Sequence, residues 1–199
     1  MSFITKFTYL IENKAVKAGF IYRMASKYYE QAIESEVTLA DIDEKDHVLC
    51  IGGGICPFSA ILIHQMTGAF VTVIDNNIKC LPKAKKLVKR LGLAEKIRVL
   101  YQEGDSSTID FSQYTVVHLA LQVSPMEQVM LAVEKNMQPG TKLLIRRPKK
   151  QLSSIYSSLT EKLLSFCPYA CHKGRNMGST VLYIKPETKA LVKEYGLVA

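Results

Sequence analysis

Hydrophobic residues change their spacing near residue 40, and this change divides the chain into two predicted regions. Before residue 40 they recur every three or four positions, a pattern typical of amphipathic helices. It predicts two helices hinged near Gly19 and thus an N-terminal helical cap over residues 1–40. We expect the tyrosines of this cap to pack against the rest of the domain rather than form a lid; they are Tyr22, Tyr28 and Tyr29.

From residue 41 onward, short hydrophobic runs alternate with helical patterns. The predicted strands are residues 48–51, 70–74, 97–101, 114–121, 141–146 and 179–184. The predicted helices are residues 57–66, 78–91, 125–136 and 151–166. Strands separated by helices require right-handed crossovers, so residues 41–199 are predicted to form a doubly wound α/β domain with a mostly parallel sheet. Ligands of such sheets bind beyond the carboxyl ends of the strands.

Composition narrows the class of protein. The chain has 199 residues, of which 48% are hydrophobic and 22% charged, as in one ordinary globular domain. Five cysteines and no recognisable secretory signal favour a reducing cytoplasm over a disulfide framework. The stretch 47–74 has no charged residue but contains glycines and polar side chains, so we expect no membrane span.

The net charge of +8 is compatible with an anionic partner. However, the chain has no Trp and no motif that interleaves aromatic and basic residues, so nucleic acid is disfavoured and a small-molecule substrate is expected. The basic residues of the predicted helix 78–91 are interpreted as a solvated face; they are Lys83, Lys85, Lys86, Lys89 and Arg90.

The most specific motif is the loop GGGICP, residues 52–57, between a predicted strand and a predicted helix. Glycines let the backbone turn tightly and approach a ligand, and the helix N-terminus offers unpaired N–H groups. A dinucleotide fingerprint requires glycine where Pro57 stands, and a phosphate-binding P-loop requires Gly-Lys-Ser/Thr after the turn. The sequence therefore argues against NAD or FAD and excludes a P-loop.

Two acidic residues follow the next two strands. Asp75 lies 23 residues after Gly52, the spacing at which a carboxylate reaches ribose hydroxyls in such folds. Asp105, in the segment EGDS, is suited to accept a hydrogen bond from the exocyclic amine of adenine. Either acid alone would be read as an ordinary loop residue. Together with the glycine loop they predict an adenosine site.

Over residues 40–185 the sequence resembles the class I S-adenosylmethionine-dependent methyltransferases. The resemblance implies a seven-stranded Rossmann-like sheet and S-adenosylmethionine as cofactor. The chain departs from the family pattern at Cys50, where an acid is usual, and at Cys56, where a third glycine is usual. The implied cofactor contacts are Gly52, Gly53, Gly54, Asp75, Asn76, Gly104, Asp105, Ser106, Leu119 and Ala120.

The loop GGGICPFS is similar instead to that of nicotianamine synthases, a branch of the same fold that transfers the aminocarboxypropyl arm of S-adenosylmethionine. The segments VVHLALQVSPMEQV, NMQPGTKLLIRRP and GSTVLYIKP are similar to that branch too. Only about 40 residues precede the first predicted strand, fewer than the N-terminal helical domain of that branch contains. The resemblance therefore supplies no catalytic residue.

Three functional hypotheses follow. The leading one is methyl transfer to a small metabolite, for which an anionic group is a candidate because Arg146 and Arg147 follow the fifth strand and could grip a carboxylate or phosphate. A solvated loop explains these arginines equally well. The second hypothesis is aminocarboxypropyl transfer that releases methylthioadenosine, and the third is a non-catalytic module that binds S-adenosylmethionine. The segment LALQ, residues 119–122, replaces the D/N-P-P-Y motif, which disfavours methylation of nucleic-acid bases.

Cysteine and histidine residues add little to this picture. Cys167, Cys171 and His172 lack a second ligand pair and suitable spacing, so no metal is expected. His64 and His118 lie on apolar segments, where a hydrogen-bonded core histidine is favoured over a catalytic one.

Overall fold

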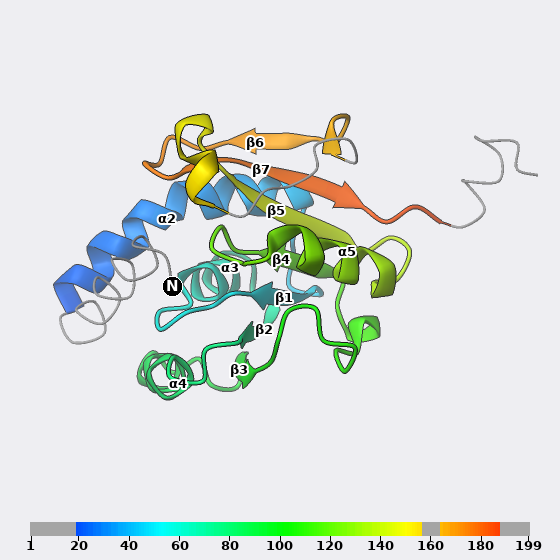
Figure 1. Ribbon diagram of the computed structural model, residues 1–199. Helices are drawn as coiled ribbons and strands as arrows, with labels where there is room; N and C mark the ends of the chain where they lie inside the picture. The colour runs from blue at the N-terminus through cyan, green and yellow to red at the C-terminus, as the bar shows by residue number, and fades with distance from the viewer. Residues whose placement is uncertain (1–18, 157–163, 188–199) are drawn as a thin grey trace, which may run out of the picture.

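The uncharged hydrophobic runs become the central strands of one seven-stranded sheet in the computed structural model, which describes residues 19–156 and 164–187 (Figure 1). The spatial order is β3-β2-β1-β4-β5-β7-β6. Strands β1 to β5 run parallel, whereas β7 is antiparallel to both β5 and β6. The strands are β1 (His47–Ile51), β2 (Phe70–Asp75), β3 (Ile97–Tyr101), β4 (Val116–Leu119), β5 (Lys142–Pro148), β6 (Tyr169–Cys171) and β7 (Met177–Ile184).

Helices cover both faces of this sheet, as the alternation of strands and helices predicted (Figure 1). One face carries α2 (Gly19–Ala40), α3 (Phe58–Thr67) and α4 (Leu81–Arg90), and the other carries α5 (Met126–Asn136). Successive side chains of a strand point to opposite faces, so β1 serves both cores. Val48 and Cys50 pack towards α2 and α3, while Leu49 and Ile51 pack towards α5.

Strand order reverses direction between β1 and β4, which are adjacent although β2 and β3 come between them in sequence. Crossovers leave such a point on opposite faces of the sheet, and a crevice opens at the carboxyl ends of the strands. The loops after β1, β2, β3 and β4 therefore converge there. This arrangement confirms the predicted doubly wound α/β fold and places its ligand-binding edge.

The N-terminal region contributes a long helix that lies on the sheet. Helix α2 contacts α3 and also β5, β6 and β7, through buried residues that include Ile33 and Ala40. Its amphipathic pattern has a direct cause, because one side must face the sheet and the other solvent. Of the two helices predicted to be hinged near Gly19, the first, which precedes Gly19, lies outside the described residues.

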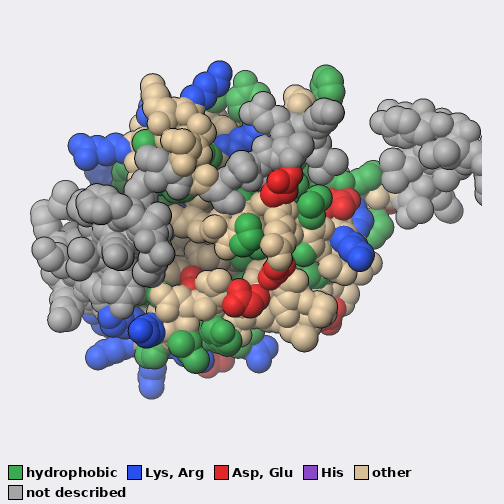
Figure 2. Space-filling model, viewed as in Figure 1, with side chains coloured by type: hydrophobic (Ala, Val, Ile, Leu, Met, Phe, Trp, Pro, Cys, Tyr) green, Lys and Arg blue, Asp and Glu red, His purple; other side chains and the backbone are tan. Residues whose placement is uncertain are grey.

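Helix α4 is short and strongly amphipathic. Its buried residues are Leu81, Ala84, Leu87 and Val88, and its exposed lysines gather at the lower edge of the molecule in Figure 2, away from the carboxyl ends of the strands. The prediction of a basic outer face is consistent with this placement. No helix among the described residues is long and apolar enough to cross a lipid bilayer.

Two predicted elements differ from those observed. The predicted helix 151–166 is wrong at its start, because residues Lys150–Ile155 form the 3-10 helix η2. There the hydroxyl of Ser153 donates to the carbonyl of Lys150, and such local bonds compete with α-helical ones. Residues 157–163 lie outside the description. The three-residue edge strand β6 was missed since it is too short to show alternation, and the strand predicted at 114–121 is shorter, at 116–119.

Because the glycine loop packs closely against β2, a side chain added at Gly53 should disturb the packing there. A Cβ added at Gly53 would lie 2.1 Å from Cγ1 of Val73, a buried strand residue that cannot move aside. We therefore expect Gly53→Ala to lower the free energy of unfolding by about 1–3 kcal/mol, as overpacking does. Urea denaturation measures this loss. The double variant Gly53→Ala/Val73→Ala removes the clash, so its loss should fall short of the sum of the single losses by about 1 kcal/mol or more. Strict additivity would show that the clash is not the cause.

Candidate functional site

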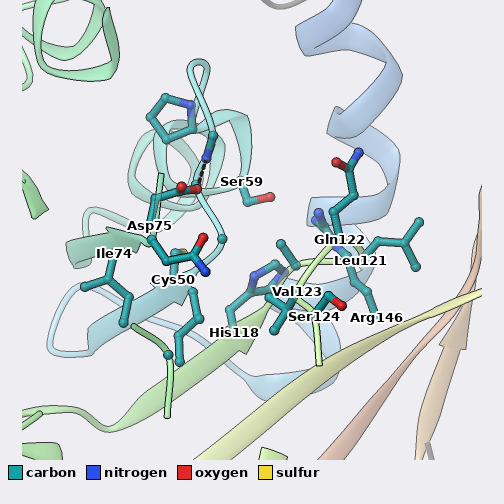
Figure 3. Close-up of a pocket in the computed structure, with 18 of the residues that line it drawn as sticks. Cys50, Ser59, Ile74, Asp75, His118, Leu121, Gln122, Val123, Ser124 and Arg146 are labelled. Carbon is teal, nitrogen blue, oxygen red and sulfur yellow. Dashed lines mark hydrogen bonds between the residues drawn. The ribbon is translucent and has the colours of Figure 1, made fainter. Parts of the chain in front are cut away.

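A cavity of about 680 Å³ opens at the carboxyl ends of β1, β2, β3, β4 and β5 (Figures 2 and 3). Its volume lies in the range of pockets that hold small molecules. One half is formed by the loops that follow the strands and carries glycines, acids and amides. The other half lies under α2 and is largely aromatic. We call these halves the loop half and the helix half.

The glycine loop is tied to the end of β2 by backbone hydrogen bonds. The N–H of Gly52 donates to the carbonyl of Ile74 at 2.9 Å. The N–H of Gly54, which has a φ of 62°, donates to Oδ2 of Asp75 at 2.7 Å. Glycine enters this left-handed conformation without the strain that a side chain would cause.

Asp75 therefore organises the loop half in addition to facing the cavity. Its Oδ1 accepts a second hydrogen bond from the N–H of Asn77 at 2.8 Å, and Figure 3 shows its carboxylate beside the loop. Each carboxylate oxygen has two lone pairs, so both oxygens retain capacity for a ligand hydroxyl. The predicted ribose contact is compatible with this geometry.

The far wall of the loop half is built from the ends of β2 and β3. The amide of Asn76 donates to Oε2 of Glu103 at 3.0 Å, linking the two loops. Asp105 accepts a hydrogen bond from the amide of Gln128 on α5 at 2.6 Å. A ligand that uses the Asp105 carboxylate must therefore share it with Gln128.

Most of the predicted cofactor residues converge on the cavity. Those that line it are Gly52, Gly53, Gly54, Asp75, Asn76, Gly104, Asp105 and Ala120. Ser106 and Leu119 are not among the described lining residues; Leu119 is buried in the core against α5, and Ser106 pairs with Thr108.

The two predicted substrate arginines lie in different places. Arg146 lines the cavity, whereas Arg147 is not among its described lining residues. The guanidinium of Arg146 is only 3% exposed and already grips a carboxylate of the protein itself, because Nε and Nη2 donate to Oε1 and Oε2 of Glu36 at 2.7 and 2.8 Å. Two of its donors are thus unavailable to a substrate.

Aromatic side chains form the helix half. Tyr29 stacks on Phe58 with ring centroids 5.5 Å apart, and Tyr28 meets Tyr29 edge to face at 5.2 Å. The hydroxyl of Tyr28 accepts a hydrogen bond from the N–H of Arg175 at 2.9 Å. Tyr28 and Tyr29 therefore pack as expected and also line the cavity. Tyr22 lies where side chains are outside the description.

Beneath this aromatic wall, α2 inserts the carboxylate of Glu36 into the sheet. Besides Arg146, its partners are Nε2 of His118 at 3.2 Å and the hydroxyl of Thr180, which donates at 2.6 Å. Nε2 of His172 lies 2.7 Å from the same Thr180 hydroxyl. These five buried residues, Glu36, His118, Arg146, His172 and Thr180, are called the Glu36 cluster below.

The charge state of the cluster follows from its contacts. Burial alone would raise the pKa of Glu36, but Arg146 and His118 hold that pKa well below its usual value. Burial lowers the pKa of His118, and Arg146 lowers it further, while Glu36 opposes both. At neutral pH the cluster thus contains a carboxylate, a guanidinium and neutral imidazoles.

Cys50 stands where the class I methyltransferase pattern usually has an acid, and it lies next to this cluster. Burial raises the pKa of its thiol to about 12, and Glu36 adds to that effect while Arg146 opposes it. The position is therefore uncharged. A second carboxylate here would share a dry site with Glu36, which like-charge repulsion disfavours.

Sequence reasoning missed Glu36, although a signal was present. Glu36 follows Ile33 by three residues and precedes Ala40 by four, so it lies on the buried stripe of α2. A charged residue on such a stripe indicates a buried partner. His64 is hydrogen-bonded as predicted, since its Nδ1 lies 2.8 Å from the carbonyl oxygen of Ala69, but it is half-buried at the end of α3 and does not lie in the core. No cluster of potential metal ligands occurs among the described residues.

Comparison with known proteins identifies a matching family and a curated relative. The family model described as nicotianamine synthase protein matches residues 27–171. The L-histidine 2-aminobutanoyltransferase of Yersinia pestis is 24% identical over 145 residues, which are 73% of this chain and 49% of that enzyme. The chain thus spans about half the length of this curated relative.

Solved structures share the fold. The crystal structure of MtNAS in complex with MTA and tNA has a TM-score of 0.74 at 17% identity and covers 92% of this chain and 71% of that one. An RNA methyltransferase from Salinibacter ruber in complex with S-adenosyl-L-homocysteine has a TM-score of 0.61 at 21% identity and covers 79% and 92%. The sheet and its helices therefore have the methyltransferase fold.

Removal of one charge from the Glu36 cluster should destabilise the protein strongly. We expect Glu36→Gln to lower the free energy of unfolding by about 3–5 kcal/mol, because Arg146 would remain buried without a counter-charge. Urea denaturation at pH 7 measures the loss. Glu34→Gln on the exposed side of the same helix is the matched control and should change stability by no more than about 0.5 kcal/mol. Similar stability of the two variants would contradict a structural role for the buried pair.

Proposed function

The chain belongs to the nicotianamine synthase family, and from this membership we propose that it binds S-adenosylmethionine and transfers the aminocarboxypropyl group to an amine, releasing methylthioadenosine. The observation that carries the proposal is the two-part cavity. Its loop half has the glycines and acids expected around an adenosine, and its helix half adjoins it within the same cavity.

Each relative supports one part of the proposal. The structure of a point mutant of MtNAS is in complex with S-adenosylmethionine, and another MtNAS structure contains MTA. The name of the Yersinia pestis relative describes transfer of a 2-aminobutanoyl group to L-histidine. These proteins are similar to this chain in family and fold, and they favour aminocarboxypropyl transfer over the methyl transfer that the sequence put first.

The charges in the helix half also bear on the acceptor. Methyl transfer to an anionic metabolite was linked to a bidentate grip by Arg146, but that side chain is neutralised by Glu36. The remaining wall is aromatic and amide-bearing, with Tyr29, Phe58 and Asn176 among its residues. A wall of this kind offers no free cation to a carboxylate or phosphate, so it does not support an anionic acceptor.

The chemistry requires little from the protein beyond alignment. The amine lone pair attacks the γ-carbon of the methionine arm, a carbon–nitrogen bond forms, and the carbon–sulfur bond breaks with its electrons going to sulfur. The sulfonium becomes a neutral thioether, so the leaving group needs no proton. The loop half would hold the adenosine, and the cavity walls would aim the amine at one carbon rather than another.

The identity of the product tests the proposal. The protein is incubated with S-adenosylmethionine, alone and with L-histidine, and the nucleoside products are separated by chromatography and mass spectrometry. We expect methylthioadenosine in excess of the spontaneous rate. S-adenosylhomocysteine would instead establish methyl transfer. Binding of S-adenosylmethionine with neither product from either incubation would favour the non-catalytic alternative.

The proposed cofactor site has its own test at Asp75. We expect Asp75→Ala to weaken S-adenosylmethionine binding by about 1.5–3 kcal/mol, since it removes a charged acceptor and frees the Gly54 N–H. Isothermal titration calorimetry should show a Kd about 10- to 150-fold higher.

Asp110→Ala is the control, because this exposed acid accepts hydrogen bonds from Ser112 and does not line the cavity. It should leave the Kd unchanged. Equal affinity of Asp75→Ala and the wild type would remove Asp75 from the cofactor site.

A further inference from the structure

His118 lies where the two halves of the cavity meet. On β4 it pairs with Cys50 on β1, and Cys50 lies two residues before the glycine loop begins. The side chain of His118 lines the cavity. Figure 3 shows it between Cys50 and Arg146. The ring is buried in the wall of the cavity at this junction.

The two ring nitrogens of His118 have different surroundings. Nε2 faces Glu36, and because a carboxylate only accepts hydrogen bonds, Nε2 carries the proton. Nδ1 is then a bare acceptor, and it is buried without a hydrogen-bond partner. A buried acceptor left unpaired costs about 1–3 kcal/mol, a cost that a donor on a bound ligand would remove.

The groups around His118 keep it ready to accept a proton. Burial and Arg146 lower its pKa, so the ring is neutral at pH 7, whereas Glu36 favours the protonated form. The titratable and charged groups that face it are Glu36 from α2, Cys50 from β1, Arg146 from β5 and His172 from the segment after β6. A protonated ring would thus lie against a fixed carboxylate, the arrangement that stabilises imidazolium in general-base catalysis.

We propose that His118 accepts the proton of the attacking amine at Nδ1 and that Glu36 positions the ring; this rests on the aminocarboxypropyl transfer proposed above. The acceptor enters as an ammonium ion, whose nitrogen has no free electron pair. Transfer of one N–H proton to Nδ1 yields a neutral amine and an imidazolium held by Glu36. The freed pair then forms the new carbon–nitrogen bond while the carbon–sulfur electrons go to sulfur. His118 returns the proton to water when the products leave.

Two substitutions separate this role from a structural one. His118→Gln places an amide near the position of Nε2, so it keeps the bond to Glu36 but has no base. His118→Asn places its amide near Nδ1 and loses the bond to Glu36. His64→Gln is the control, since His64 is hydrogen-bonded to Ala69 and does not line the cavity.

The assay is methylthioadenosine release from S-adenosylmethionine, with L-histidine or a second S-adenosylmethionine molecule as the acceptor, over pH 5 to 10. For His118→Gln we expect a melting temperature and a cofactor Kd close to those of the wild type, but a rate at pH 7 lower by about 10²- to 10⁴-fold. The deficit should shrink as the pH approaches the pKa of the acceptor amine. His118→Asn should lose activity and also melt at a lower temperature, and His64→Gln should retain the wild-type rate.

The wild-type pH profile tests the same proposal if a variant fails to fold. At saturating acceptor the rate should rise with pH and level off at or below about 6.5, the ordinary pKa of histidine. A rise that continues to the ordinary amine range of about 8–10 would overturn the role of His118, as would His118→Gln activity within threefold of wild type at every pH. If the wild type releases no methylthioadenosine, the proposed function itself fails and this inference falls with it.

Discussion

The bidentate pair between Glu36 and Arg146 is the interaction on which the rest of the site depends. A lone carboxylate in a dry interior costs several kcal/mol, so Glu36 can remain charged there only while the guanidinium holds it. The pair joins α2 to β5, and Thr180 extends the link to β7. Because α2 also carries Tyr28 and Tyr29, this buried contact fixes the aromatic wall over the carboxyl ends of the strands.

The same pair determines the electrostatic character of the cavity. It cancels the charge of the arginine that the sequence offered as a substrate anchor, while burial keeps Cys50 and His118 uncharged beside it. The helix half is therefore polar but without net charge, in contrast to the acidic loop half with Asp75, Glu103 and Asp105. Two ends with such different chemistry suit a ligand that is a nucleoside at one end and an amino-acid chain at the other.

Local sequence patterns were enough to predict the fold and the loop half. The strands contain short hydrophobic runs, the glycine loop directly follows β1, and Asp75 ends β2, so each can be recognised within a few residues. The Glu36 cluster could not be assembled in this way, because Glu36 is 82 residues from His118, 110 from Arg146 and 144 from Thr180 in the chain. Only the three-dimensional packing of α2 brings them together. Similarly, β6 forms by pairing with β7, and its three residues are too few to show a periodicity that would predict a strand.

Burial of the Cys50 thiol protects the protein from alkylation at this position. A sulfonium compound alkylates thiolates readily, and Cys50 lines the cavity proposed to hold one. Burial raises the pKa of this thiol to about 12, so Cys50 is protonated at pH 7. Burial beside the glycine loop thus shields the protein from alkylation by the proposed cofactor, and the chain can carry sulfur at that position where an exposed cysteine would be consumed.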